Sequence, residues 1–188
     1  PHAVLVANVH TGLSVTQEAI LFAEIDAKTK NLCTWDRWRS RRAAGEPVVL
    51  DIEEAARTAG FSIAMAPKDG NIRCVAALER VYRLGGVQLL GEALQMIAHM
   101  WGRGADSADA AIVVGLARLL HTYRDDLDYR HLGEVLVAMV PRQIKARAQA
   151  LREAENGEIG KLAAKYLITT YNTGFSPKLD RAKLDRKP

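Results

Sequence analysis

The stretch IVVGLARLLHTY, residues 112–123, repeats large apolar side chains at intervals of three and four residues. Val113, Leu116, Leu120 and Tyr123 therefore fall on one face of an α-helix, which this spacing predicts to pack against other helices. The same spacing recurs in the segments on either side. The flanking apolar positions are Leu78, Val81 and Tyr82; Leu90, Leu94, Ile97 and Trp101; Leu132, Val135, Leu136 and Met139; Ile144, Ala148 and Leu151; and Ile159, Leu162, Tyr166 and Leu167.

Glycine and proline mark the ends of these helices. Gly85-Gly86 and Gly157 each separate two helical patterns, because glycine is a poor helix former. Pro141 suits the first position of a helix, where no backbone donor is needed. The chain becomes polar after Asn172, so we expect residues 174–188 to form a basic, flexible tail.

Four further elements are predicted before residue 61. The apolar run HAVLVANV, residues 2–9, is typical of a buried strand. Ser14 and Gln17 form a capping-box pattern at the start of the helix in SVTQEAILFAEID. A second helix runs from a Thr34 cap to Ala44, before Gly45 and Pro47. A third presents Val49, Ile52, Ala56 and Ala59 on one face and ends at Gly60.

The segments FSIA and NIRC, separated by PKDG, predict a small hairpin, because Asp69-Gly70 is a turn signal between two short apolar runs. The expected fold is therefore mainly α: a multi-helix, bundle-like domain with a short N-terminal strand and this hairpin. We expect a first domain over residues 1–45, a helical domain over 46–173 and the tail over 174–188.

The composition limits the classes of protein to which the chain can belong. With 188 residues and 48% hydrophobic side chains, the chain can bury a sizeable core. It contains no apolar run of about 20 residues and no signal-peptide pattern, so we expect a cytoplasmic protein without a membrane partner. The two cysteines, Cys33 and Cys74, have no metal-type spacing, and reduced thiols are expected.

Positive charge is concentrated in two segments. Residues 28–42 carry six positive side chains against Asp36 alone, and residues 176–188 carry five against Asp180 and Asp185. The net charge is only +4, so the rest of the chain is acidic on balance. Basic clusters of this kind attract polyanions, although they are also common on solvated surfaces.

The first cluster contains TWDRWRSRR, residues 34–42, with two tryptophans and four arginines. At about 100° per residue, Trp35 and Trp38 share one side of this helix while the arginines surround it, which argues against a recognition helix lying in a groove. Acidic residues that could neutralise arginines follow: Glu46, Asp51, Glu53 and Glu54. Two interpretations stay open: tryptophans in the core with solvated arginines, or contact with nucleic acid through phosphates and stacked bases.

Sequence motifs for catalysis or cofactors are weak. The five histidines lack the spacing of a zinc site, and YRDDLDYRH lacks the glycine and glutamate of a calcium loop. GEIGK, residues 157–161, lacks the spacing of a phosphate loop. We expect no catalytic residue, no metal and no cofactor, and therefore no enzyme whose site lies within this chain.

The order of segments resembles the second half of the ParB-like core of chromosome-partition, phage and actinobacterial proteins. Pro1 with VLVANV is similar to its strand, TQEAILFAEID to its helix and NLCTWDRW to its next helix entry. RWRSRRAAGEPV, NIRCVAALERVYRLGG and YNTGF are similar to actinophage proteins of the DGQHR type within that superfamily.

This resemblance implies a DNA-associated ancestry and a DGQHR-like half preceding Pro1, whose strands would complete the sheet of residues 4–9. Where the family has a Glu-Asn pair that helps to hold nucleotide and metal, this chain has Ile25 and Asp26. The family's arginine is matched only by Lys28 or Lys30, which puts nucleotide binding in doubt.

Two functions from different classes follow. The first is a non-catalytic, DNA-associated accessory protein of phage or mobile-element type that contacts phosphates through Lys28, Lys30, Arg37, Arg39, Arg41 and Arg42, with the tail as a further contributor. The alternative is a helical module that binds a host or partner protein, or the missing N-terminal segment, with Trp35 and Trp38 as anchors.

Overall fold

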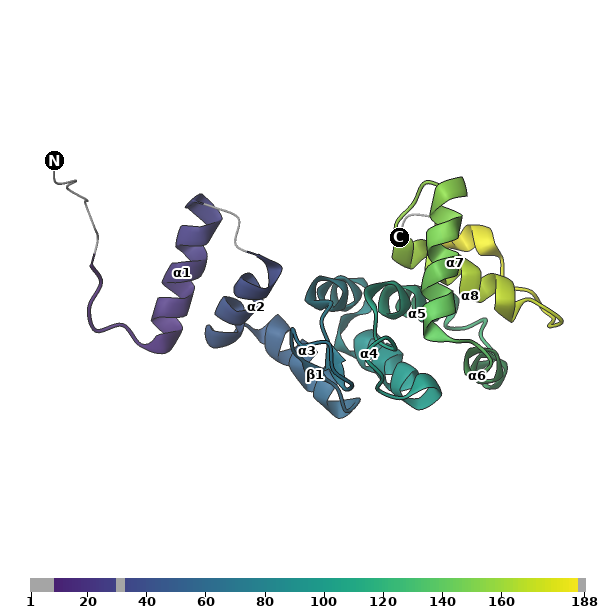
Figure 1. The fold of residues 1–188 in the computed structure, drawn as a ribbon, viewed down its shortest axis with the longest axis horizontal. Helices are drawn as coiled ribbons and strands as arrows, with labels where there is room; N and C mark the ends of the chain where they lie inside the picture. The colour runs from purple at the N-terminus through teal and green to yellow at the C-terminus, as the bar shows by residue number, and fades with distance from the viewer. Residues whose placement is uncertain (1–8, 30–32, 186–188) are drawn as a thin grey trace. The chain divides into compact units, whose positions relative to one another are not determined.

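The computed structural model describes residues 9–29 and 33–185, with the backbone alone for residues 26–29. It is mainly α-helical, as the periodicity predicts, and the described residues contain eight α-helices and one pair of very short strands (Figure 1). The chain divides into two compact units, residues 1–50 and 51–188. We expected a boundary after residue 45. The predicted strand over residues 2–9 lies outside the described residues except for Val9, which is in no strand.

The first unit contains helices α1 (Val15–Thr29) and α2 (Thr34–Ala43), which pack against each other. The capping box before α1 is confirmed: the Ser14 backbone N–H donates to Gln17 Oε1 over 2.9 Å, and the Gln17 N–H donates to Ser14 Oγ over 3.3 Å. The N-cap of α2 is Cys33, one residue before the predicted Thr34. Gly45, with φ of 71°, ends this helix in a conformation that favours glycine.

Helix α3 (Pro47–Thr58) follows the predicted pattern, and the boundary between the two units falls within it. Val49, Ile52, Ala56 and Ala59 are all at most 3% exposed. Gly60 follows with φ of 80°. The helix period in the sequence therefore identified the buried face correctly.

The predicted hairpin is wrong. Strands β1 (Ser62–Ile63) and β2 (Asn71–Ile72) do pair, but they run parallel. Instead of closing a two-residue turn, Asp69 Oδ1 accepts from the Ala105 N–H over 2.9 Å and the Gly70 N–H donates to the Arg103 carbonyl over 2.6 Å. These bonds hold the connection against a distant loop, and β2 returns in the same direction as β1.

The second unit is built around α5. Helix α4 (Val75–Trp101) bends at the predicted break, where Gly85 and Gly86 leave helical geometry and Gly86 has φ of 71°. Helix α5 (Ala110–Tyr123) packs on α4 and on α8 (Ile159–Tyr171). Nearly all of α5 is buried. Helices α6 (Tyr129–Val137) and α7 (Pro141–Ala154) complete this unit, and Pro141 occupies the predicted first turn.

The C-terminal segment, expected to be a flexible tail, is docked over the residues that the structure describes. Leu179 and Leu184 are 6% and 5% exposed. The Tyr123 hydroxyl donates to the Asp180 carbonyl over 2.6 Å, and the Asn172 side chain exchanges two hydrogen bonds with the Leu179 backbone. A short 3₁₀ helix, η1 (Arg181–Asp185), follows and packs on α5 and α8. The two buried leucines supply the apolar contacts that dock this segment, although most of its other residues are polar.

Two glycines let α5 and α8 approach closely. A Cβ atom on Gly115 would lie 2.8 Å from the Ala163 Cβ and 3.2 Å from the Gly160 carbonyl oxygen. A Cβ atom on Gly160 would collide with Val114. Neither position has room for a methyl group, so both glycines are required by packing between the helices.

We predict that Gly115→Ala lowers the free energy of unfolding by about 1–2 kcal/mol, because the cost of overpacking exceeds the gain in helix propensity. Urea denaturation followed by circular dichroism measures it. Gly91→Ala in α4 is the matched control, since its Cβ would meet nothing within 4 Å, and it should leave stability unchanged or raised. Equal effects of the two substitutions would contradict the close-approach explanation.

Candidate functional site

The basic segment of residues 28–42 is the site that the sequence singles out. Arg37, Arg39 and Arg42 are exposed on α2, and Arg41 is half-buried. Lys30 lies outside the described residues, and of Lys28 only the backbone, in α1, is described. The structure therefore brings four of the six predicted contact residues onto one ten-residue helix.

Arg41 is held by an ion pair at the end of α2. Its Nε and Nη2 atoms lie 2.5 and 2.6 Å from the two carboxylate oxygens of Glu46, a two-pronged geometry that is among the strongest in proteins. The hydrogen bond from Arg41 lowers the pKa of Glu46 below its ordinary value. This confirms the expected neutralisation for Glu46 and makes Arg41 a structural residue of the turn that follows α2.

Two of the other acids expected to pair with α2 have partners within the second unit. Asp51 accepts a hydrogen bond of 2.7 Å from the Tyr82 hydroxyl. Glu54 binds Arg57, one helical turn along, with distances of 2.6 and 2.9 Å. Both carboxylates are therefore engaged within their own unit.

The two tryptophans differ in burial. Trp38 is 3% exposed, while Trp35 is half-buried. A side chain as buried as Trp38 supports the core interpretation for this residue over the interpretation as a partner anchor. Around it, α2 consists mostly of polar and charged side chains.

Cys74 and His131 lie in structural environments. Burial, followed by the negative charge of Asp109, raises the pKa of the Cys74 thiol to about 12, so it is protonated at neutral pH and a poor nucleophile. His131 Nε2 lies 2.9 Å from the Tyr171 carbonyl oxygen, and its ring stacks on Phe175 with centroids 3.8 Å apart. Within the described parts of the chain, no three metal-ligating side chains cluster.

A groove that sequence reasoning missed lies between α3, α4 and α6. It has a volume of about 860 Å³ and combines Glu54, Glu92 and His99 with apolar residues such as Met96 and Met100. The sequence of α4 does contain a pattern that could have predicted this groove. Its polar residues recur at helical spacing, at Gln88, Glu92, Gln95 and His99. Glu92 is already engaged by Arg124 at 2.8 Å and by the Tyr129 hydroxyl at 3.2 Å.

Comparison with known proteins identifies one family. A family model with the description "Family of unknown function (DUF6551)" matches residues 2–178. No curated protein and no solved structure matches the chain. Among the helices of the described residues, none has both the length and the apolar character needed to cross a membrane.

We predict that Ellman's reagent at pH 8 modifies one thiol per native chain quickly and the second only after unfolding. Cys33 is exposed, whereas the raised pKa of Cys74 keeps its thiol protonated well above pH 8. Cys33→Ser should remove the fast reaction. A fast reaction that persists in this variant would show that Cys74 is accessible and ionised.

Proposed function

The chain belongs to the DUF6551 family of unknown function, and we propose that it is a DNA-associated accessory protein, without catalytic activity, that contacts phosphates through α2. It resembles ParB-like proteins in the order of its N-terminal segments, which supports a phage or mobile-element origin. It would act in the cytoplasm, where DNA is accessible to it.

The observation that carries the proposal is the exposure of Arg37, Arg39 and Arg42 on a single short helix. Arginine is suited to this role because its planar guanidinium group binds phosphate oxygens through two parallel hydrogen bonds. Arg37 and Arg39 are about 200° apart around the helix. Such an arrangement favours electrostatic contact with the backbone of DNA over the reading of bases in one groove.

The C-terminal segment supports the proposal less. Arg181 binds Glu155 over 2.6 Å, and Lys183 binds Asp126 over 2.8 Å. In each pair a carboxylate partly offsets a positive charge that we expected to contribute to DNA binding. The main contact is therefore assigned to α2.

We predict that replacing Arg37, Arg39 and Arg42 together by glutamine weakens binding to random-sequence duplex DNA and flattens its salt dependence. Each lost phosphate contact lowers the slope of log K against log salt by about 0.9, so the expected change is roughly 3. Fluorescence anisotropy with labelled DNA, titrated between about 50 and 200 mM salt, measures both quantities.

The matched control replaces Arg83, Arg124 and Arg130 by glutamine, which gives the same change in net charge. These arginines are also exposed but lie in the second unit, where each pairs with a glutamate. The control should bind DNA as the wild type does. Equal losses in the two variants, or no binding of the wild type at low salt, would contradict a contact surface on α2.

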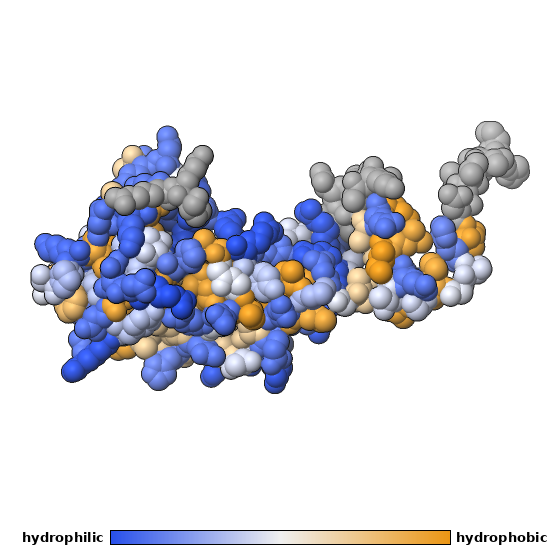
Figure 2. Space-filling view, turned by 180° about the vertical axis from the view of Figure 1, so that it is seen from behind, coloured by the Kyte–Doolittle hydropathy of each residue, from blue (hydrophilic) through white to orange (hydrophobic). Residues whose placement is uncertain are grey.

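A second candidate, a module for binding another protein, is favoured by the apolar surface of α1. Val15, Ile20, Phe22 and Ile25 are between 46% and 72% exposed, and hydrophobic side chains are visible at the surface of this unit (Figure 2). Large exposed apolar side chains on one helix are typical of interaction surfaces. Trp35 could extend this surface, whereas Trp38 is packed in the free chain.

We predict for this second candidate that Phe22→Ser with Ile25→Ser abolishes capture of a partner by the immobilised chain, because the apolar contact is lost. The triple glutamine variant of α2 should retain the partner. The opposite pattern, with capture dependent on the arginines and independent of Phe22 and Ile25, would exclude this role for α1.

A further inference from the structure

A second groove in the unit of residues 51–188 differs from the first in its chemistry. It has a volume of about 410 Å³ and lies between α7 and α8, beside η1. Its lining residues are Arg147, Ala150, Leu151, Tyr166, Thr169 and Arg181. The lining contains two arginines and no acidic side chain, whereas Glu54 and Glu92 line the larger groove. This lining favours an anionic ligand.

Two of its donors are uncommitted. Among the residues that the structure describes, the exposed Arg147 side chain makes no ion pair or hydrogen bond, and the half-buried Tyr166 hydroxyl has no hydrogen-bond partner. The guanidinium group offers five N–H donors and the phenol one. These groups reach the groove from two different helices, α7 and α8.

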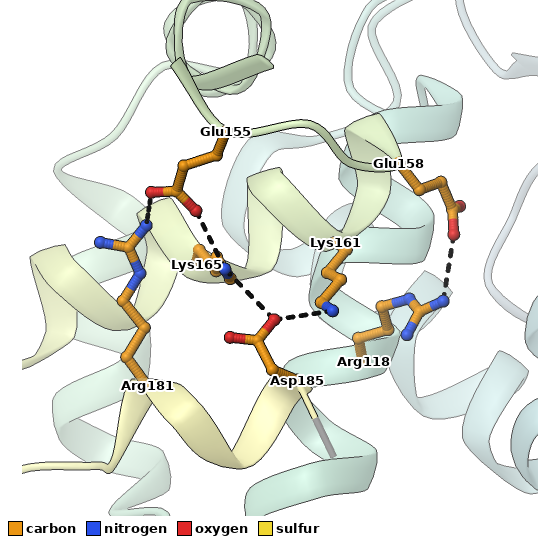
Figure 3. Close-up of polar contacts among 7 residues, drawn as sticks. All are labelled: Arg118, Glu155, Glu158, Lys161, Lys165, Arg181 and Asp185. Carbon is orange, nitrogen blue, oxygen red and sulfur yellow. Dashed lines mark hydrogen bonds and ion pairs between the residues drawn. The ribbon is translucent and has the colours of Figure 1, made fainter. Parts of the chain in front are cut away.

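Arg181 is positioned at the groove by a chain of ion pairs (Figure 3). Its Nη2 atom lies 2.6 Å from Glu155, whose other carboxylate oxygen is 2.9 Å from the Lys165 Nζ. Lys165 and Lys161 then share Asp185, at 3.2 and 2.7 Å. One hydrogen bond occupies one edge of the Arg181 guanidinium group, so its remaining donors are available to a ligand.

The charges of this chain of ion pairs do not cancel. Hydrogen bonds from Lys165 and Lys161, respectively, lower the pKa values of Glu155 and Asp185, so both carboxylates are ionised at neutral pH. Of the three cations that they face, Arg181 alone lines the groove, where Arg147 supplies the second positive charge. Two positive charges match the charge of a phosphate monoester, about −1.5 to −2 at pH 7.

The rest of the groove is apolar. Leu151, Ala150 and the ring of Tyr166 provide surface on which a flat group can pack or stack. A volume of about 410 Å³ is within the range for small-molecule sites. We infer that this groove binds a small phosphate monoester whose other end is a flat ring, with Arg147 and Arg181 on the phosphate and Tyr166 against the ring.

The test is isothermal titration calorimetry of the full chain with phenyl phosphate, adenosine 5′-monophosphate, inorganic phosphate and phenol. We expect binding of one or both of the ring-bearing phosphates, and much weaker binding of phosphate or phenol alone. Comparison of phenyl phosphate with adenosine 5′-monophosphate shows whether the groove prefers an aryl phosphate or a nucleoside phosphate. If inorganic phosphate bound as tightly as both ring-bearing phosphates, the inference that a flat ring packs in the groove would be wrong.

The decisive variant is Arg147→Gln, because this exposed side chain has no described partner whose loss would affect folding. It should weaken binding at least about tenfold, as expected for the loss of a hydrogen bond to a charged group. Arg152→Gln, on the same helix but outside the groove, is the matched control and should bind as the wild type does. Equal losses in both variants, or no binding of any ring-bearing phosphate at millimolar concentration, would overturn the proposal.

This groove does not depend on the DNA contact of α2. The triple glutamine variant of α2 should bind the phosphate monoester normally, and Arg147→Gln should bind DNA normally. Failure of one proposal is thereby distinguishable from failure of the other. Loss of monoester binding in the α2 variant would also count against the assigned groove.

Discussion

The close approach of α5 and α8 is the constraint on which the second unit depends. Gly115 and Gly160 remove the side chains that would otherwise hold the two helices apart. Small residues at such a crossing allow the larger apolar side chains on either side to interdigitate and exclude water. Because α5 also packs on α4, and α8 on α7, the position of this pair fixes the neighbours of both helices. The groove between α7 and α8 therefore depends on that arrangement.

Helix α8 also organises the charges of the unit. Glu158, just before the first turn of α8, forms an ion pair with Arg118 of α5 at 3.0 Å (Figure 3). It forms a second ion pair with Arg80 of α4. Burial, followed by the positive charge of Arg80, lowers the pKa of Arg118. Further along α8, Lys161 and Lys165 bind Asp185 of the docked C-terminal segment. One helix thus connects the core to a segment that its composition alone would place in solvent, and it positions Arg181 beside the groove.

The two units present different chemistry to a ligand. The first exposes arginines on α2 and apolar side chains on α1, which suits extended partners such as DNA or another protein surface. The second satisfies most of its exposed charges in pairs, and Arg147 is among the donors without a described partner. Surface ion pairs contribute little to stability, typically below about 1 kcal/mol each, but they fix where a guanidinium group points. Arg41 and Arg181 are both examples, one ending α2 and the other lining a groove.

The sequence by itself determined the features that depend on residues within about one helical turn. These include the helix spans, their buried faces, the Ser14–Gln17 capping box, the break at Gly85-Gly86 and the availability of Glu46 to Arg41. The tertiary structure decided the rest: the parallel direction of β2, the docking of Leu179 and Leu184, and the meeting of Arg147 with Arg181. Local periodicity reports the face that each helix buries, but it carries no information about which distant segment will cover that face.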